Sequence, residues 1–504
     1  MKLEALLHKV YGTTPNDGNL QPKEAVAYAV AGFGQNFICT IIGSYLTIFM
    51  TDALLFGSAN VMIGSVSGAM AVAYLMLGTR IFDACNDPIM GSIVDKTRTK
   101  YGKCRPYLKW MAIPIAIMTL LCFNPFVEAG TVRTFVYIAV VYVIWSVVYT
   151  VVDVPYWALS SSMTNNTIVR GNLLTVTRLV CTLGAGIVTV GVPIITDLVT
   201  AKYKDETGTV LPEFIYDNAN ALKWTYFICA VVFTVVAIPM FYYGFKNTKE
   251  RIKSLENPPS LGHNLKLLFK NRELMLIVIS GILGGARMVY TYTGGLYFAR
   301  YVLHNDSWYS LITLLVVPGG LVASLLVPWM TKKFTKKWAY IYVHILGAVV
   351  MFAMYFIGYD APWKLIVCAI GLVLLGIPQG ANNILSYAMI GDTVDYLEWK
   401  TGERAEGICF AMQTLMNKIG MAVGAFIGVF SYDWAGINPT AADGVYITAQ
   451  GEQTLWNLLV LSGALSMVGT IIPILFYRLT EKKQREMVKE IAERKAAQGE
   501  QEAE

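Results

Sequence analysis

The chain has 504 residues, of which 55% are apolar and only 15% are charged. The length alone is typical of about three soluble domains of roughly 150 residues, but soluble domains contain about 25% charged residues. The 11 Trp, 29 Tyr, 22 Phe and 43 Gly residues fit a polytopic membrane protein instead. A disordered chain, a collagen, a disulfide scaffold and a soluble enzyme are disfavoured. The net charge of +6 is too small and too dispersed to indicate nucleic-acid binding.

The cysteines do not form a metal-binding or disulfide pattern. No CxxC pair occurs, and nearly all of them lie in or beside apolar runs. Buried free thiols behave as small apolar side chains, so we expect no metal, redox or other cofactor. The N-terminus lacks a short apolar stretch followed by a small-residue cleavage site, so we expect no signal peptide. The eight cysteines are Cys39, Cys85, Cys104, Cys122, Cys181, Cys229, Cys368 and Cys409.

Long apolar stretches recur along the whole chain. A helix needs roughly 20 mostly apolar residues to cross the hydrocarbon core of a bilayer, and about twelve such stretches occur. We therefore predict an all-α membrane protein with twelve transmembrane helices. The predicted spans are 25–51, 61–82, 107–126, 134–158, 173–198, 222–245, 274–301, 309–330, 339–358, 364–391, 407–432 and 453–477.

The basic residues of the loops predict the orientation, because Lys and Arg favour the cytoplasmic side. The loops after the second, sixth and eighth spans are rich in Lys and Arg, whereas the opposite loops contain only Arg133, Lys202, Lys204 and little else. Both termini are therefore predicted on the cytoplasmic side of a multi-pass protein in the inner membrane. Nothing of domain size lies outside the membrane.

The longest basic loop, which contains Pro258, Pro259 and Gly262, divides the spans into two groups of six. A basic loop also follows the second span of each group, at 95–109 and 331–338, as a weak internal repeat. The stretch from Arg478 mixes opposite charges at i,i+4 spacing, which predicts a solvated cytoplasmic helix or a frayed tail. The predicted parts are an N-terminus (1–24), a six-helix bundle (25–245), a middle loop (246–273), a second six-helix bundle (274–477) and a tail (478–504).

Ionisable residues inside the spans are functional candidates, because charge is costly in hydrocarbon. Near the end of the second predicted span, Asp83, Asn86 and Asp87 follow i, i+3, i+4 spacing and project from one helix face. Two carboxylates and an amide are hard oxygen ligands that suit a small cation. The alternative is that Arg80, one turn earlier, merely neutralises the acids at a cytoplasmic helix end.

In the fourth span, Thr150, Asp153 and Trp157 share a helix face. Asp153 is far from both predicted helix ends, so its charge cannot reach the interface. The Thr150 hydroxyl could complete a cation shell, and the Trp157 ring could stack on the apolar face of a sugar. The alternative for Trp157 is an interfacial or packing aromatic.

Two cations, Arg178 in the fifth span and Lys418 in the eleventh, need anionic partners, and Asp83, Asp87 and Asp153 are available. Pairing across the two groups of spans would form a gate, whereas the alternative is a static ion pair. Gln413 and Thr414 precede Lys418 and could add hydrogen bonds. Arg287 in the seventh span is a further intramembrane cation whose role the sequence does not assign. The four scattered histidines and the absence of a phosphate-binding motif favour binding and translocation over enzymatic catalysis.

Read together, these segments resemble the glycoside–pentoside–hexuronide:cation symporter family. The residues that carry the resemblance are RIFDACNDPIMGSIVDKTRTKYGKCRPYL at 80–108, YTVVDVPYW at 149–157, Arg178, GDTVDYLEWKTGERAEG at 391–407 and QTLMNK at 413–418. They extend from the second predicted span to the eleventh. The resemblance implies the major-facilitator fold, with two six-helix bundles around a central cavity that alternates its access.

The resemblance also implies a role for each matching residue. Asp83, Asn86, Asp87 and Thr150 match the cation site, which would hold Na⁺ or H⁺, and Asp153 stands between cation and sugar. The positions that match the sugar pocket are Trp157, Arg178, Gln413, Thr414 and Lys418. The positions that match the cytoplasmic loop motif, expected to brace the helices together with Arg80, are Gly91, Asp95, Gly102, Lys103 and Arg105.

One departure from the family pattern concerns the first span. Where the galactoside-binding member has a Lys–Asp pair, this chain has Gln35 and Asn36. Asn36 can still bond sugar hydroxyls, but a carboxylate is missing, and a binding aromatic of the tenth helix aligns with Asn383. An anionic hexuronide, a neutral pentoside and a glucoside all stay open as substrates.

The leading interpretation is a cation-coupled sugar or glycoside symporter, a monomer surrounded by lipid that takes no nucleic-acid partner and no cofactor beyond the coupling ion. Asn86 and Thr150 add neutral oxygens that favour Na⁺, with H⁺ as the second choice. Two alternatives are a sodium-dependent lysolipid transporter of a related branch and a non-transporting membrane sensor or scaffold.

Overall fold

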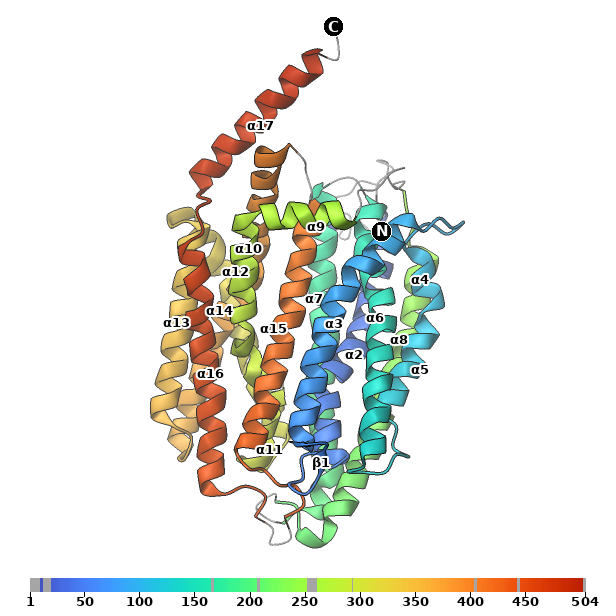
Figure 1. Cartoon of the computed structure of the whole chain (residues 1–504), viewed down its shortest axis with the longest axis vertical. Coiled ribbons are helices and arrows are strands. Elements are labelled where there is room, and N and C mark those ends of the chain that lie inside the picture. The colour runs from blue at the N-terminus through green and yellow to red at the C-terminus, as the bar shows by residue number, and fades with distance from the viewer. Residues whose placement is uncertain are drawn as a thin grey trace. The chain divides into compact units, whose positions relative to one another are not determined.

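The computed structural model describes residues 10–11, 20–164, 167–205, 209–251, 261–291, 293–402, 406–441 and 445–501. Among these residues, ten helices are long and apolar enough to cross a membrane. Many large apolar side chains on these helices are exposed, including Leu325 at 80% and Phe356 at 81%. Such surfaces are unfavourable in water and are expected where helices contact lipid. The chain is an all-α, multi-pass membrane protein (Figure 1).

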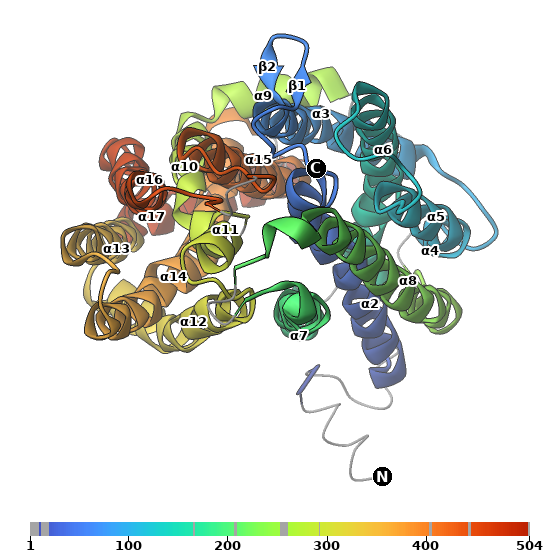
Figure 2. The ribbon, with the colours of Figure 1, turned by 90° about the horizontal axis from the view of Figure 1, so that it is seen from below.

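The contacts divide the chain into two units. The N-terminal unit comprises Met1–Pro258, Ala299–Ser310 and Gly436–Thr448. The C-terminal unit comprises Pro259–Phe298, Leu311–Ala435 and Ala449–Glu504. Each unit is a bundle of helices, which Figure 2 shows end-on.

The N-terminal unit is built from long helices and a small hairpin. The helices are α2 (Pro22–Ile48), the π-helix η1 (Phe49–Ala53), α3 (Gly68–Lys96), α4 (Arg105–Trp110), α5 (Ala112–Cys122), α6 (Val132–Met163), α7 (Thr167–Thr200) and α8 (Ile215–Asn247). Short 3₁₀ turns lie at Ala201–Tyr203 (η2) and Pro212–Phe214 (η3). The hairpin pairs β1 (Met62–Ile63) with β2 (Val66–Ser67) in antiparallel register.

The second predicted span was placed too early in the chain. Residues 62–67 form the hairpin, and α3 begins only at Gly68, where the Ser67 hydroxyl accepts a hydrogen bond from the Met70 N–H as an N-cap. The helix then continues through Pro88 to Lys96. Proline is tolerated inside membrane helices because neighbouring groups satisfy the freed carbonyl. Asp83, Asn86 and Asp87 therefore lie inside α3 rather than at its end.

The C-terminal unit contains the remaining helices. They are α9 (Leu261–Lys270), α10 (Arg272–Leu283), the 3₁₀ segment η4 (Gly285–Thr291), α11 (Thr293–Tyr301), α12 (Ser307–Lys333), α13 (Lys336–Ile357), α14 (Pro362–Thr401), α15 (Glu406–Trp434), α16 (Ala449–Leu475) and α17 (Glu481–Gln501). The last residues of α11 and the first of α12 belong to the N-terminal unit by their contacts.

Two of the twelve predicted spans are interrupted. The third is divided at Met111 into α4 and α5, and the seventh consists of α10, η4 and α11. The break in the seventh span keeps its carbonyl groups bonded, since Ser466 donates to the Leu283 oxygen at 2.7 Å and Arg287 donates to the Gly284 oxygen at 2.7 Å. Irregular backbone at membrane depth needs such internal partners. Arg287, unassigned from the sequence, thus stabilises this break.

The C-terminal tail is not simply a solvated helix. The buried side chains of Leu479 and Met487 belong to the same apolar core as α14 residues. Trp399 of α14 donates to Glu490 at 2.7 Å, and Arg494 donates back to the Trp399 carbonyl oxygen at 2.9 Å. The first part of α17 therefore packs against α14 in the C-terminal unit.

Small residues let α2 and α8 approach closely. A Cβ atom on Gly244 would lie 2.6 Å from the Ala31 Cβ and 3.3 Å from the Ala27 carbonyl oxygen. Because lipid tails are as apolar as the helix surfaces, close van der Waals packing between small residues is a principal source of helix association in membranes. Gly244 is thus required by space rather than by backbone conformation.

We predict that Gly244→Ala lowers the unfolding free energy by about 1–3 kcal/mol, the usual cost of overpacking. The measurement is thermal unfolding of the purified chain in detergent. Gly78→Ala is the matched control, because Gly78 is exposed on α3 and its added Cβ would meet nothing within 4 Å. Equal melting temperatures for the two variants would contradict the packing argument.

Candidate binding site

Two hydroxyl–carboxylate contacts join α3 to α6 in the N-terminal unit. The Ser146 hydroxyl donates to Asp83 Oδ1, and the Thr150 hydroxyl donates to Asp87 Oδ1 at 3.3 Å. Because 83 and 87, like 146 and 150, are four residues apart, the contacts repeat after about one helical turn. We call them the Ser146–Asp83 rung and the Thr150–Asp87 rung. The first carboxylate is buried, with 1% of its residue surface exposed, and the second is half-buried.

Arg80 and Asn86 complete the polar face of α3. Arg80 is buried in the middle of the helix, and its Nη1 lies 3.6 Å from Asp83 Oδ2. Both oxygens of Asp83 therefore have a polar partner. The Asn86 amide nitrogen is buried and has no hydrogen-bond partner. Arg80 thus belongs beside the predicted cation site rather than with the cytoplasmic loop.

One carboxylate oxygen of Asp153, on α6, accepts hydrogen bonds from three side chains. Tyr149 donates to its Oδ1 at 3.3 Å, Trp157 Nε1 donates at 3.1 Å, and Gln35 Nε2 makes a third, short contact. Only 7% of the Asp153 surface is exposed. A buried carboxylate that accepts several hydrogen bonds is stabilised in its charged form.

In the first span, Gln35 and Asn36 bond different partners. Gln35 reaches Asp153 and Tyr149, and its own carbonyl oxygen is buried without a partner. Asn36 instead donates to the Gly32 carbonyl oxygen of its own helix at 2.9 Å. Asn36 was predicted from the sequence as a binding residue, whereas Gln35, Tyr149 and Ser146 were not. Their residue types carry no charge, so no membrane-cost argument identifies them.

Trp157 and Arg178 form one stacked pair between α6 and α7. The Arg178 Cζ lies 5.6 Å from the centroid of a Trp157 ring, within the range of a cation–π contact. The same indole bonds Asp153, so a single aromatic plane connects an anion with a cation. This combination offers a ring surface for stacking together with charged hydrogen-bonding groups.

The predicted sugar residues of the eleventh span lie in the C-terminal unit, on α15. Gln413 and Lys418 are buried, whereas Thr414 is exposed. Gln413 Nε2 donates to Asn417 at 3.4 Å and leaves its carbonyl oxygen buried without a partner. Asn383 of α14 is exposed. The pairing of Lys418 with acids of the N-terminal unit stays a prediction.

Glu250, whose role was not predicted from the sequence, bonds the backbone of the cytoplasmic loop motif. The Glu250 carboxylate accepts backbone N–H groups of Lys103, Cys104 and Arg105 at 2.8–2.9 Å. Gly102 makes room for it, with a φ of +105° and no space for a Cβ. Arg105 in turn donates to the Phe245 carbonyl oxygen at 2.7 Å.

Two other residues of this motif, Gly91 and Asp95, lie on α3. A Cβ on Gly91 would meet nothing within 4 Å, so space does not require a glycine there. The side chain of Asp95 is outside the described residues. The loop residues that the structure brings together are thus Gly102, Lys103 and Arg105, through Glu250.

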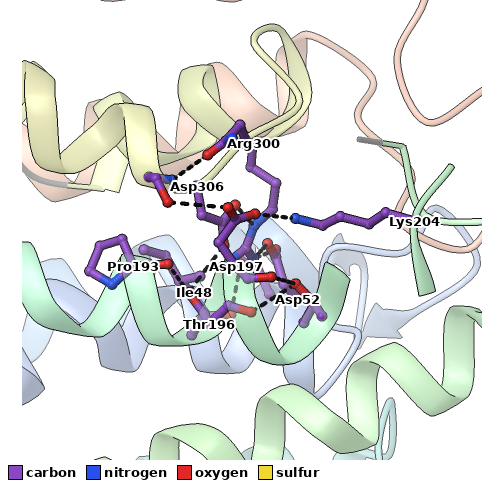
Figure 3. Close-up of polar contacts among 12 residues, drawn as sticks. Ile48, Asp52, Pro193, Thr196, Asp197, Lys204, Arg300 and Asp306 are labelled. Carbon is purple, nitrogen blue, oxygen red and sulfur yellow. Dashed lines mark hydrogen bonds and ion pairs between the residues drawn. The ribbon is translucent and has the colours of Figure 1, made fainter. Parts of the chain in front are cut away.

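A second buried charge cluster lies within the N-terminal unit, and Figure 3 shows it in close-up. Arg300 bonds Asp306 through two nitrogens, at 2.6 and 2.9 Å, and also contacts Asp52 at the end of η1. Burial alone would raise the pKa of Asp306, but the Arg300 guanidinium more than offsets this and holds the pKa below its usual value. Nearby, Lys204 pairs with Asp197 at 2.7 Å. Arg300 therefore neutralises acids from two separate segments.

We predict that Arg300→Ala costs about 3–5 kcal/mol of unfolding free energy, because it leaves buried carboxylates without their cation. The measurement is again thermal unfolding in detergent. Lys364→Ala is the control, since it removes the partner of Asp360, whose side chain is 71% exposed, and exposed pairs contribute only about 0–1 kcal/mol. A melting temperature for Arg300→Ala equal to that of the control would be inconsistent with the cluster as described.

Among the described residues, no three His, Cys, Asp or Glu side chains lie close enough to share a metal ion. A cation bound between α3 and α6 would take its oxygens from the two rungs and from the Asn86 amide. Hydroxyl, amide and carboxylate oxygens suit hard cations and not the soft transition metals. The site's donor set therefore fits a hard coupling cation.

Three comparisons place the chain among known proteins. A family model described as MFS/sugar transport protein matches residues 27–481. The isoprimeverose transporter of Lactiplantibacillus pentosus is 28% identical, over 81% of this chain and 80% of the relative. The glucuronide carrier protein homolog of Escherichia coli (strain K12) is 26% identical, over 94% and 96% of the two chains. The crystal structure of the nucleoside transporter NupG shares the fold, with a TM-score of 0.56, 13% identity, and coverage of 90% of this chain and 99% of that one.

Proposed function

This chain belongs to the MFS/sugar transport protein family, and from that premise we propose that it takes up a sugar or glycoside together with a cation by alternating access. The cation is Na⁺, and it binds between α3 and α6. The two rungs carry this proposal, because they direct two carboxylates and two hydroxyls to one helix–helix interface inside the membrane-spanning bundle. Charged side chains inside a membrane span cost free energy, so their presence there indicates a functional role.

The sugar is proposed to bind beside Asp153. The Trp157 ring offers a stacking surface, Arg178 lies over it, and the Gln35 carbonyl oxygen is a buried acceptor without a partner. A sugar hydroxyl would satisfy that acceptor, and leaving it unsatisfied costs about 1–3 kcal/mol. The two relatives, an isoprimeverose transporter and a glucuronide carrier protein homolog, support a glycoside as the class of substrate.

Coupling follows from the shared helix α6. Thr150 of the cation rung and Asp153 of the sugar site are three residues apart on it and share a face. A cation that draws on α6 oxygens therefore changes the field at Asp153, and a sugar bound at Asp153 changes the field at the rungs. Such a mutual free energy is typically about 1–3 kcal/mol and acts equally on both ligands.

The remaining assignments complete the proposal. We place the protein in the cytoplasmic membrane with both termini inside, since the basic loops favour that side. We propose that it acts as a monomer in contact with lipid, without a cofactor and without enzymatic activity, a proposal supported by the transporters among its relatives. Arg287 has a structural part at the helix break.

The first test is sugar uptake into proteoliposomes under an inward Na⁺ gradient. With radiolabelled isoprimeverose and a methyl glucuronide as probes, we predict that Asp87→Asn reduces Na⁺-stimulated accumulation at least tenfold, because the amide lacks the charge that offsets Na⁺ dehydration. The control is Asp360→Asn, whose side chain is exposed between α13 and α14. If Asp87→Asn accumulates as much sugar as the control does, Asp87 is not part of the cation site.

A further inference from the structure

We infer that Ser146 is a positioning residue of the cation site, where it does for Asp83 what Thr150 does for Asp87. This inference rests on the proposed function and deepens it, since it adds a residue that neither the sequence motifs nor the resemblance assigns. The observation behind it is the repetition of the rungs. Both partners of the first rung are separated by 63 positions, and so are both partners of the second.

The equal separation has a geometric meaning. Two helices that pack side by side present equivalent contacts at each turn when their registers match. The Ser146–Asp83 and Thr150–Asp87 rungs are such equivalent contacts, with a hydroxyl on α6 and a carboxylate on α3 in each. Asn86, with its buried amide nitrogen unpartnered, precedes Asp87 on the same face of α3.

Asp83 differs from Asp87 because the Arg80 guanidinium lies beside it and competes with a bound cation for its carboxylate. Arg80 lies 3.6 Å from Asp83 Oδ2 and would draw the carboxylate toward itself if nothing held its other oxygen. Ser146 holds that other oxygen, Oδ1. A hydroxyl that donates its hydrogen keeps two lone pairs, so Ser146 can fix Asp83 and still offer an oxygen to Na⁺. Without it, Asp83 is free to close fully onto Arg80.

The opposing interpretation is that Ser146 merely bonds two helices together. Ser146 has 1% of its surface exposed, so loss of its hydroxyl could lower stability in any case. The two interpretations differ in what they change. A helix brace alters the stability of the ligand-free protein, whereas a positioning residue alters the Na⁺ concentration at which the protein responds.

The experiment is a Na⁺ titration of the thermal stability of the purified full chain in detergent, with choline chloride to keep the ionic strength constant. We expect Ser146→Ala to raise the half-saturating Na⁺ concentration roughly tenfold or more, the scale of a hydrogen bond to a charged group. Ser146→Thr keeps a hydroxyl and should restore the wild-type value to within about threefold. Ser161→Ala is the control on the same helix, because Ser161 is exposed and donates to the Ala158 carbonyl oxygen of its own helix.

The outcomes separate cleanly. A Ser146→Ala protein whose half-saturating Na⁺ concentration is unchanged overturns the inference, whatever its melting temperature, and so does a Ser146→Thr protein that has lost the Na⁺ response. A wild-type protein whose stability responds only to protons also overturns it. Failure of sugar accumulation by the wild-type protein would instead reject the proposed function, and that result is read from the uptake assay and not from this titration.

Discussion

The burial of carboxylates between α3 and α6 is the constraint on which the rest of the N-terminal unit depends. Asp83 and Asp153 are almost fully buried in helices long enough to span a membrane, and an uncompensated charge there costs several kcal/mol. The structure compensates them with an arginine, hydroxyls, an indole and an amide. Because these donors come from α2, α3 and α6, the packing of the three helices and the electrostatics of the site cannot vary separately.

The same constraint explains how a site for two ligands can be assembled from few residues. The hydrogen bonds to Asp83, Asp87 and Asp153 described above come from neutral hydroxyl, indole and amide donors, which can turn toward a ligand, and Asp83 has the Arg80 guanidinium beside it as well. The Arg300 cluster is of the other kind, since its acids are paired with a guanidinium through several short bonds. The contrast distinguishes a site that can exchange partners from a cluster that maintains the fold.

Much of this arrangement could be predicted from the sequence, because its strongest signals are local. Long apolar runs indicated most of the spans, and acids at i, i+3 and i+4 within the second span marked a polar helix face. The second span was predicted at 61–82, but α3 runs from Gly68 through Pro88 to Lys96, because a helix in a membrane tolerates an internal proline. The sequence did not predict the roles of Ser146, Gln35 and Glu250. Each acts through a contact with a segment far away in the chain, and local spacing does not indicate such a contact.

The central claim is that a cation at the rungs and a sugar at Asp153 stabilise each other through α6. The most direct measurement is a pair of binding titrations on the purified protein, of the sugar with and without Na⁺ and of Na⁺ with and without the sugar. The account predicts that each ligand tightens the other by the same factor, roughly 5- to 150-fold. Sugar affinity that is identical in Na⁺ and in choline would contradict it.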